Sequence, residues 1–403
     1  MQIHTLKNGI RLLHIKDCLP ITYCGFAINA GTRDEHTNEY GIAHFTEHCL
    51  MKGTKKRNNR QIIDRIEAIG GELDAYTTKE ETFIYVTVPQ PQTERAIDLL
   101  SDILFNSTFP KAEILKEKNV IEDEIQSYND SPSELIFDEF EELIFQSSPL
   151  EHNILGNEKL FNSFTTEKFQ SYIKRCYTTD NILFFIQGNI EEEKLLKLAE
   201  KYFVANSSKR NFKRTAPTIY APQNIEKDKD TFQVHCLMGN LTYRFGYNND
   251  LTTTLLNNIV GGPFMSSRLN MAVRERNGLV YCIDSSLTLY SDIGYWGVYF
   301  GCDKQNYNKC TALIYNELEK LTMTQISDTQ LKKAKQMFSG NLLIVSQNKE
   351  NRLLAAARSV LHLDHFRTEQ EILAKLEQIS AAELHKEAQQ LFDMDKFTVL
   401  KFV

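Results

Sequence analysis

The sequence lacks several features that would assign it to particular classes of protein. No apolar run approaches the length of a membrane span, and no dense basic patch is present, so we expect neither a membrane protein nor a nucleic-acid-binding protein. The net charge of −7 is modest and also argues against a nucleic-acid partner. Residues 1–16 lack the continuous apolar core of a signal peptide and read instead as two short strands around a turn at Asn8-Gly9.

The eight cysteines contain no C-x-x-C pair and show no regular spacing. Free thiols in a reducing compartment are the simplest interpretation, and we therefore expect a cytoplasmic location. The hydrophobic fraction of 42% and the charged fraction of 25% are ordinary for a globular protein. A chain of 403 residues is long enough for two or three domains.

The most informative segment is the pentapeptide His44-Phe45-Thr46-Glu47-His48. Residues four apart lie on one face of a helix, so both imidazoles can reach one metal ion, with Glu47 beside them. Two nitrogen ligands and a nearby carboxylate are typical of a hydrolytic zinc site, here in the inverted H-x-x-E-H order. The pentapeptide alone leaves open a helix with exposed or core-satisfied histidines. Cys49 is interpreted as a buried structural thiol rather than a ligand.

A catalytic zinc site needs a third protein ligand. Residues 111–128 are predicted to form a helix, and the spacing of Glu117, Ile121 and Glu124 places them on one face. Glu124 is the candidate ligand. Glu117, two turns earlier on the same face, could orient one of the metal ligands by a hydrogen bond without touching the metal itself. Because Glu122 and Asp123 are adjacent, a solvated acidic face is the alternative.

The chain divides into two halves that look alike. Residues 207–230 are polar, basic and contain Pro217 and Pro222, which predicts a linker between domains at 1–206 and 231–403. Each half begins with β-rich sequence and continues into amphipathic helices, which predicts two α+β domains related by duplication. The second half has no metal motif. Its chemical feature is Arg274 and Tyr281, for which a helix-end Arg and a core Tyr are the simpler reading.

Several motifs in order resemble the pitrilysin, insulinase and mitochondrial-processing-peptidase family of inverted zinc peptidases. They are Ala30-Gly31-Thr32-Arg33, Gly41-Ile42-Ala43, residues 44–54, Gly70-Gly71-Glu72-Leu73-Asp74-Ala75-Tyr76-Thr77, residues 117–124, Gln187-Gly188-Asn189-Ile190 and residues 274–281. Two positions depart from the pattern: Asp74 stands where the family usually has Asn, and Ser148-Pro149-Leu150-Glu151 replaces a commoner His-Pro-Leu-Gly.

The resemblance implies two homologous domains, each an antiparallel sheet flanked by helices. It further implies a zinc endopeptidase for peptides or unfolded polypeptides, with one Zn²⁺ held by His44, His48 and Glu124, Glu47 as general base, and Glu117 behind the ligands. An edge strand containing Leu73, Asp74, Ala75, Tyr76 and Thr77 would bind the peptide backbone, and Arg274 and Tyr281 would contact the substrate and its oxyanion.

Longer relatives carry four such domains, with the metal in the first and the Arg/Tyr pair in the fourth. The resemblance therefore implies a dimer in which each subunit completes the site of the other, a homodimer or a heterodimer with a related chain. A non-catalytic subunit, or a specific processing peptidase, is the alternative function.

Overall fold

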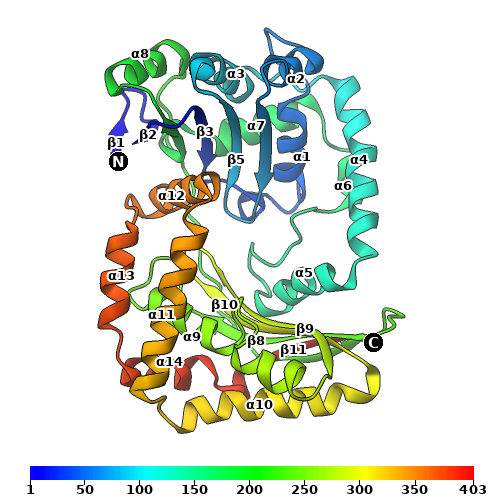
Figure 1. Cartoon of the computed structure of the whole chain (residues 1–403). Helices are drawn as coiled ribbons and strands as arrows, with labels where there is room; N and C mark the ends of the chain where they lie inside the picture. The colour runs from blue at the N-terminus through cyan, green and yellow to red at the C-terminus, as the bar shows by residue number, and fades with distance from the viewer. The chain divides into compact units, whose positions relative to one another are not determined.

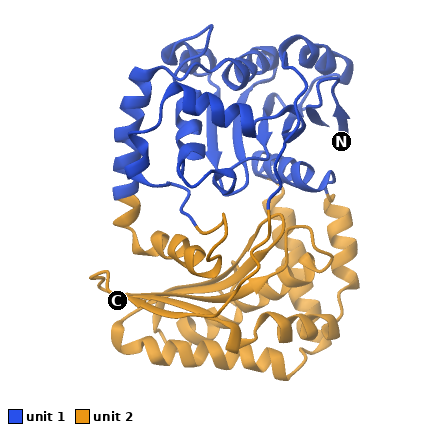
Figure 2. Ribbon diagram, turned by 180° about the vertical axis from the view of Figure 1, so that it is seen from behind, with its two compact units in different colours: residues 1–126, 152–214, 348–366 blue, residues 127–151, 215–347, 367–403 orange.

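The computed structural model describes residues 1–403 and shows two compact units (Figure 2). Unit 1 comprises residues 1–126, 152–214 and 348–366, and unit 2 comprises residues 127–151, 215–347 and 367–403. No helix combines the length and apolarity that a membrane span requires. The predicted cytoplasmic location stays a prediction.

Unit 1 is built on a six-stranded sheet with the order β1-β2-β6-β3-β5-β4. The strands are β1 (Gln2–Thr5), β2 (Arg11–Lys16), β3 (Ile21–Ile28), β4 (Glu72–Thr77), β5 (Thr82–Pro89) and β6 (Ile182–Gly188). The helices are α1 (Ile42–Leu50), α2 (Asn59–Glu67), α3 (Thr93–Asn106), α4 (Lys111–Asn129, which continues into unit 2), α6 (Glu158–Phe161), α7 (Thr166–Cys176), α8 (Glu192–Tyr202) and α12 (Lys349–Leu363). Figure 1 labels most of these elements.

Unit 2 is built on a five-stranded sheet with the order β7-β11-β8-β10-β9. The strands are β7 (Asn224–Lys227), β8 (Val234–Thr242), β9 (Val280–Leu289), β10 (Gly294–Cys302) and β11 (Thr398–Phe402). The helices are α5 (Pro132–Ile144), α9 (Asp250–Val260), α10 (Tyr307–Met323), α11 (Asp328–Val345), α13 (Glu369–Gln378) and α14 (Ala381–Leu391), with a π-helical segment at Asn270–Glu275.

Apart from β1, which has no counterpart in unit 2, the two sheets share one topology. In unit 1 the pair β2–β6 is parallel and the following pairs β6–β3, β3–β5 and β5–β4 are antiparallel. In unit 2 the pair β7–β11 is parallel and β11–β8, β8–β10 and β10–β9 are antiparallel. The prediction of two similar α+β domains is confirmed, although each sheet contains one parallel pair. By this correspondence α1 matches α9, which carries no histidine.

Successive side chains of a strand point to opposite faces of its sheet. In both units, helices pack on both faces. In β3, Phe26 packs into the main core of unit 1, which also contains residues of α1, α3 and α7. Its neighbour Ala27 faces the other way and packs with Leu353 and Val360 of α12. In unit 2, the corresponding second face is covered by α5, through residues such as Phe140.

The two halves of the chain therefore exchange one helix each. The helix α5 comes from the first half of the sequence and packs on the sheet of unit 2, whereas α12 comes from the second half and packs on the sheet of unit 1. The predicted boundaries 1–206, 207–230 and 231–403 stay a prediction. Within the predicted linker, Asn224–Lys227 is not a connector but pairs with β11 as strand β7.

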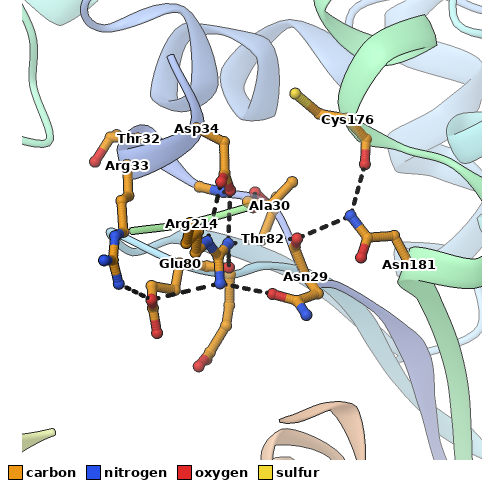
Figure 3. A network of polar contacts seen from close by, with 12 residues as sticks. Asn29, Ala30, Thr32, Arg33, Asp34, Glu80, Thr82, Cys176, Asn181 and Arg214 are labelled. Atoms are coloured by element: carbon orange, nitrogen blue, oxygen red, sulfur yellow. Dashed lines mark hydrogen bonds and ion pairs between the residues drawn. The ribbon is translucent and has the colours of Figure 1, made fainter. Parts of the chain in front are cut away.

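The predicted linker also contributes a buried arginine to unit 1 (Figure 3). Arg214 donates from Nε and Nη2 to the two carboxylate oxygens of Asp34, at 2.9 and 2.6 Å, and from Nη1 to Asn29 Oδ1 at 2.8 Å. Glu80, at the turn between β4 and β5, pairs with Arg33 at 2.6 Å. These charge-assisted bonds hold the segment that follows β3, which leads to α1, and the β4–β5 turn.

Candidate metal centre

The helix α1 places the predicted site residues on one side of a buried element. Ile42, Ala43, Phe45 and Leu50 belong to the main core of unit 1. Because residues three and four apart share a face, His44, Glu47 and His48 lie together and away from this apolar surface. Cys49 is 1% exposed and packs in the same core, outside the ligand group, which confirms its interpretation as a buried thiol.

Two buried carboxylate contacts hold the start of α1. The helix begins after Gly41, whose φ of +98° is a conformation that glycine adopts without strain. Both oxygens of Glu35 accept backbone N–H groups of this first turn, from Gly41 at 2.9 Å and Ala43 at 2.7 Å. His152 Nε2 lies 3.0 Å from the same carboxylate. A carboxylate at a helix N-terminus caps unpaired N–H groups and complements the helix dipole.

The structure brings together the three residues predicted to bind metal. His44 Nε2 lies 3.7 Å from one Glu124 oxygen, and His48 Nε2 lies 3.5 Å from the other. One ligand atom from each residue falls within 4.8 Å of the others. Ligand atoms about 2.0–2.2 Å from a tetrahedral zinc ion are themselves about 3.3–3.6 Å apart. The two His–Glu124 distances are close to this spacing, and two imidazoles with one carboxylate are a donor set that fits Zn²⁺.

The electrostatic environment of His44 also suits a metal ligand. Burial, and secondly the neighbouring His48, lower the pKa of His44 to about 3. The ring is therefore neutral at physiological pH, which is the form that coordinates a metal. The two imidazole rings meet edge to face, with centroids 4.6 Å apart.

Glu47 is next to this group but is not part of the ligand cluster. It is 8% exposed. Burial is the largest cause that raises its pKa to about 8, and the nearby carboxylates of Glu124 and Asp74 add to the effect. A cation between the ligands would lower this pKa, because it would oppose the carboxylate repulsion. The arrangement provides a carboxyl group able to accept and release a proton near neutral pH.

Glu117 lies behind His48, as predicted, and has a second partner that sequence reasoning missed. Its Oε2 is 3.4 Å from His48 Nδ1, and its Oε1 is 2.8 Å from Lys52 Nζ. The alternative of a solvated acidic face does not describe this residue, because the Glu117 side chain is 9% exposed. The sequence signals for Lys52 are its position four residues after His48 and its place in the motif of residues 44–54, but neither identifies Glu117 as its partner.

The strand β4 forms a free edge of the sheet, because it pairs only with β5. Of its residues Leu73, Asp74, Ala75, Tyr76 and Thr77, the first and third pack against the main core. The Asp74 carboxylate accepts the hydroxyl of Tyr85 at 2.9 Å, and Tyr76 stacks on Phe83. The predicted edge position is confirmed.

The remaining predicted residues, Arg274 and Tyr281, belong to unit 2. Arg274 lies in the π-helical segment Asn270–Glu275, and its guanidinium carbon is 5.8 Å from the centre of the Tyr281 ring in β9. The side chain of Tyr281 is 81% exposed. The simpler reading of a core tyrosine is therefore wrong.

Comparisons with known proteins agree with this organisation. The family described as Insulinase (Peptidase family M16) matches residues 14–158, and the family described as Peptidase M16 inactive domain matches residues 163–338. An uncharacterized zinc protease of Bacillus subtilis is 30% identical over 97% of this chain and 96% of its own length. Mitochondrial-processing peptidase subunit beta of Mus musculus is 28% identical over 85% of this chain and 72% of its own length.

Two solved structures show the same fold. A peptidase M16 inactive domain from Pseudomonas fluorescens has a TM-score of 0.90 and 18% identity, covering 100% of this chain and 97% of that one. A protease from Helicobacter pylori has a TM-score of 0.87 and 17% identity, covering 100% and 99%. The first family match spans the candidate ligands and β4, and the second spans Arg274 and Tyr281. The chain belongs to the insulinase family of peptidases, peptidase family M16.

Proposed function

We propose that this chain is a zinc-dependent endopeptidase that hydrolyses peptides or unfolded polypeptides. The observation that carries the proposal is the cluster of His44, His48 and Glu124, with the buried carboxyl of Glu47 beside it. Relatives named zinc proteases support the coarser conclusion that the chain is a peptidase.

His44, His48 and Glu124 would hold one Zn²⁺ per chain, and Glu117 would orient His48. Zinc supplies a Lewis acid that acidifies water and polarises a carbonyl group. Glu47 would take the proton from the attacking water at its carboxylate and then give that proton to the leaving amine. Removing one such acid–base group typically costs a factor of about 10²–10⁴ in rate.

The free edge of β4 supports a way to bind peptides of varied sequence. A substrate would add to this edge as a further strand, bonded through the backbone of residues Leu73, Asp74, Ala75, Tyr76 and Thr77. Arg274 and Tyr281 would donate hydrogen bonds to the substrate backbone and to the oxyanion that develops at the scissile carbonyl. The exposure of Tyr281 supports a role in contacting another molecule.

We further propose that the active form is a homodimer in which Arg274 and Tyr281 of one subunit complete the site of the other. Mixing Glu47→Gln chains with Tyr281→Phe chains tests this arrangement. A dimer with shared sites regains activity in the mixture, because some dimers contain one site with both groups intact. A mixture that stays at the level of the two parent variants contradicts the shared site.

Cleavage of a mixed peptide library tests the activity itself. We expect internal cleavage of peptides, loss of cleavage after treatment with a chelator, and recovery when Zn²⁺ is returned. Product masses would distinguish internal cleavage from trimming at the ends. An absence of cleavage by protein that contains stoichiometric zinc contradicts the proposal.

A processing or non-catalytic subunit of a hetero-oligomeric peptidase is the second candidate. The supporting observation is the mouse relative, which is named as a processing-peptidase subunit. The chain alone would then be inactive on the library and would become active only with a related partner chain. Activity of the purified chain excludes this alternative.

A further inference from the structure

Lys52, just after the end of α1, pairs with Glu117, the carboxylate behind His48. It follows α1 in the turn closed by the bond from its own N–H to Cys49 O. Its Nζ lies 2.8 Å from Glu117 Oε1, and the two side chains are 24% and 9% exposed. The pair of Lys116 with Glu113 on α4 is more exposed, since its lysine side chain is 67% exposed.

The two oxygens of Glu117 have different partners. Oε1 contacts Lys52, and Oε2 lies 3.4 Å from Nδ1 of His48. The opposite ring nitrogen of His48, Nε2, faces Glu124 at 3.5 Å. A carboxylate that accepts from Nδ1–H fixes the tautomer in which Nε2 carries the lone pair, and Nε2 is the atom that faces the candidate metal position.

The charges around Glu117 and His48 explain why a positively charged side chain is needed beside Glu117. Glu47, Glu117 and Glu124 bring three carboxyl groups close to two histidines, and a ligating histidine is neutral. A buried carboxylate without an opposite charge or enough donors is unfavourable and tends to turn toward water. Lys52 supplies the opposite charge at the oxygen that does not face His48, so that the other oxygen stays directed at Nδ1.

We propose that Lys52 is a positioning residue of the metal centre: it holds Glu117 in the orientation that presents Nε2 of His48 to the metal. This inference rests on the proposed function, because it concerns the same zinc site. The competing explanation is that the pair only fastens the end of α1 to α4, in which case stability changes and metal affinity does not.

Zinc affinity of the full-length chain distinguishes these explanations. We would measure the zinc dissociation constant of each variant by competition with a chromophoric chelator, and the absorption spectrum of the Co²⁺-substituted protein. Loss of a group that orients a ligand typically weakens metal binding about 10–100-fold. We expect that loss for Lys52→Met, and a recovery of most of the affinity for Lys52→Arg, which restores the cation.

Two further variants separate the proposed path from other effects. Glu117→Gln should weaken zinc binding to a similar degree, and adding Lys52→Met to it should cause little further loss, because both changes break one chain of contacts. Lys116→Met is the matched control on α4, and we expect its zinc dissociation constant to stay within about twofold of wild type. If Lys52→Met does not fold, Lys52→Gln takes its place.

Affinity of Lys52→Met within twofold of wild type, with an unchanged Co²⁺ spectrum, overturns the inference. So does equal weakening by Lys52→Arg and Lys52→Met, because the charge would then not be the cause. A wild-type chain that binds no zinc contradicts the proposed function instead, so that the two failures are distinguishable.

Discussion

Replacing Gly156 with alanine should disturb the start of α1 from outside the helix. Gly156 has a φ of +82°, and a Cβ added there would lie 2.2 Å from the Cα of Gly41, 2.5 Å from its nitrogen and 2.6 Å from Tyr40 O. All three are backbone atoms, which cannot move aside by rotating a side chain. An ordinary contact begins at 3.4 Å, so the two segments would have to separate by about 1 Å.

The expected magnitude combines two effects. A residue with a Cβ in a left-handed conformation costs about 1–2 kcal/mol, and forcing a group into a filled space costs about 1–3 kcal/mol. Gly156→Ala should therefore lower the free energy of unfolding by about 2–5 kcal/mol. Gly70 is the matched control, because it also has a positive φ, +71°, but an added Cβ would meet nothing within 4 Å.

The assay is urea unfolding of the wild type and both variants, with the slope compared to detect changes in the unfolded state. We expect Gly70→Ala to lose only the conformational part, about 1–2 kcal/mol. We also expect Gly156→Ala to weaken zinc binding, because Gly41 directly precedes the helix that carries His44 and His48. Equal destabilisation by the two substitutions would refute the steric reasoning.

Two further predictions concern buried charges. Burial raises the pKa of Glu387, which accepts a hydrogen bond from the hydroxyl of Thr253 at 2.6 Å. The contribution of the protonated carboxyl to folding stability is full below about pH 4.5, the ordinary pKa of Glu. This contribution is lost as the pH rises through the raised pKa. Glu387→Gln stays neutral, so its thermal midpoint relative to wild type should rise between pH 4 and pH 8, and a pH-independent difference would contradict the shift. Arg214→Met removes one of the two arginines that contact each of the buried carboxylates Asp34 and Glu80, which keep Arg210 and Arg33 respectively. It should therefore lower stability by about 3 kcal/mol in urea unfolding, and a loss below about 1 kcal/mol would show that the network contributes little.

Local sequence patterns predicted the parts of the site that lie on single elements. The spacing in His44-x-x-Glu47-His48 and between Glu117 and Glu124 fixes which side chains share a helix face, so both faces could be predicted. Their meeting depends on the packing of α1 against α4, and the resemblance to a known family supplied that step. The edge position of β4 was predicted in the same way and is confirmed.

Contacts between distant segments could not be predicted from periodicity. The apolar stripe of α12 shows that one face is buried, but not that it packs on the sheet of unit 1. The polar composition of residues 207–230 predicts a linker, yet Arg214 is buried against Asp34 and residues 224–227 pair with β11. The roles of Glu35 and Lys52 were missed because a sequence does not show which group a side chain contacts: Glu35 caps the start of α1, six to eight residues away, and Lys52 pairs with Glu117 on α4.

The central claim is that one zinc ion and the carboxylate of Glu47 together hydrolyse peptide bonds. The most direct measurement is the zinc content and the peptide-cleavage rate of wild type and Glu47→Gln, purified in parallel. We predict one zinc per chain in both proteins and a cleavage rate at least about 100-fold lower in the variant. A Glu47→Gln protein that retains its zinc and cleaves peptides at the wild-type rate would contradict the claim.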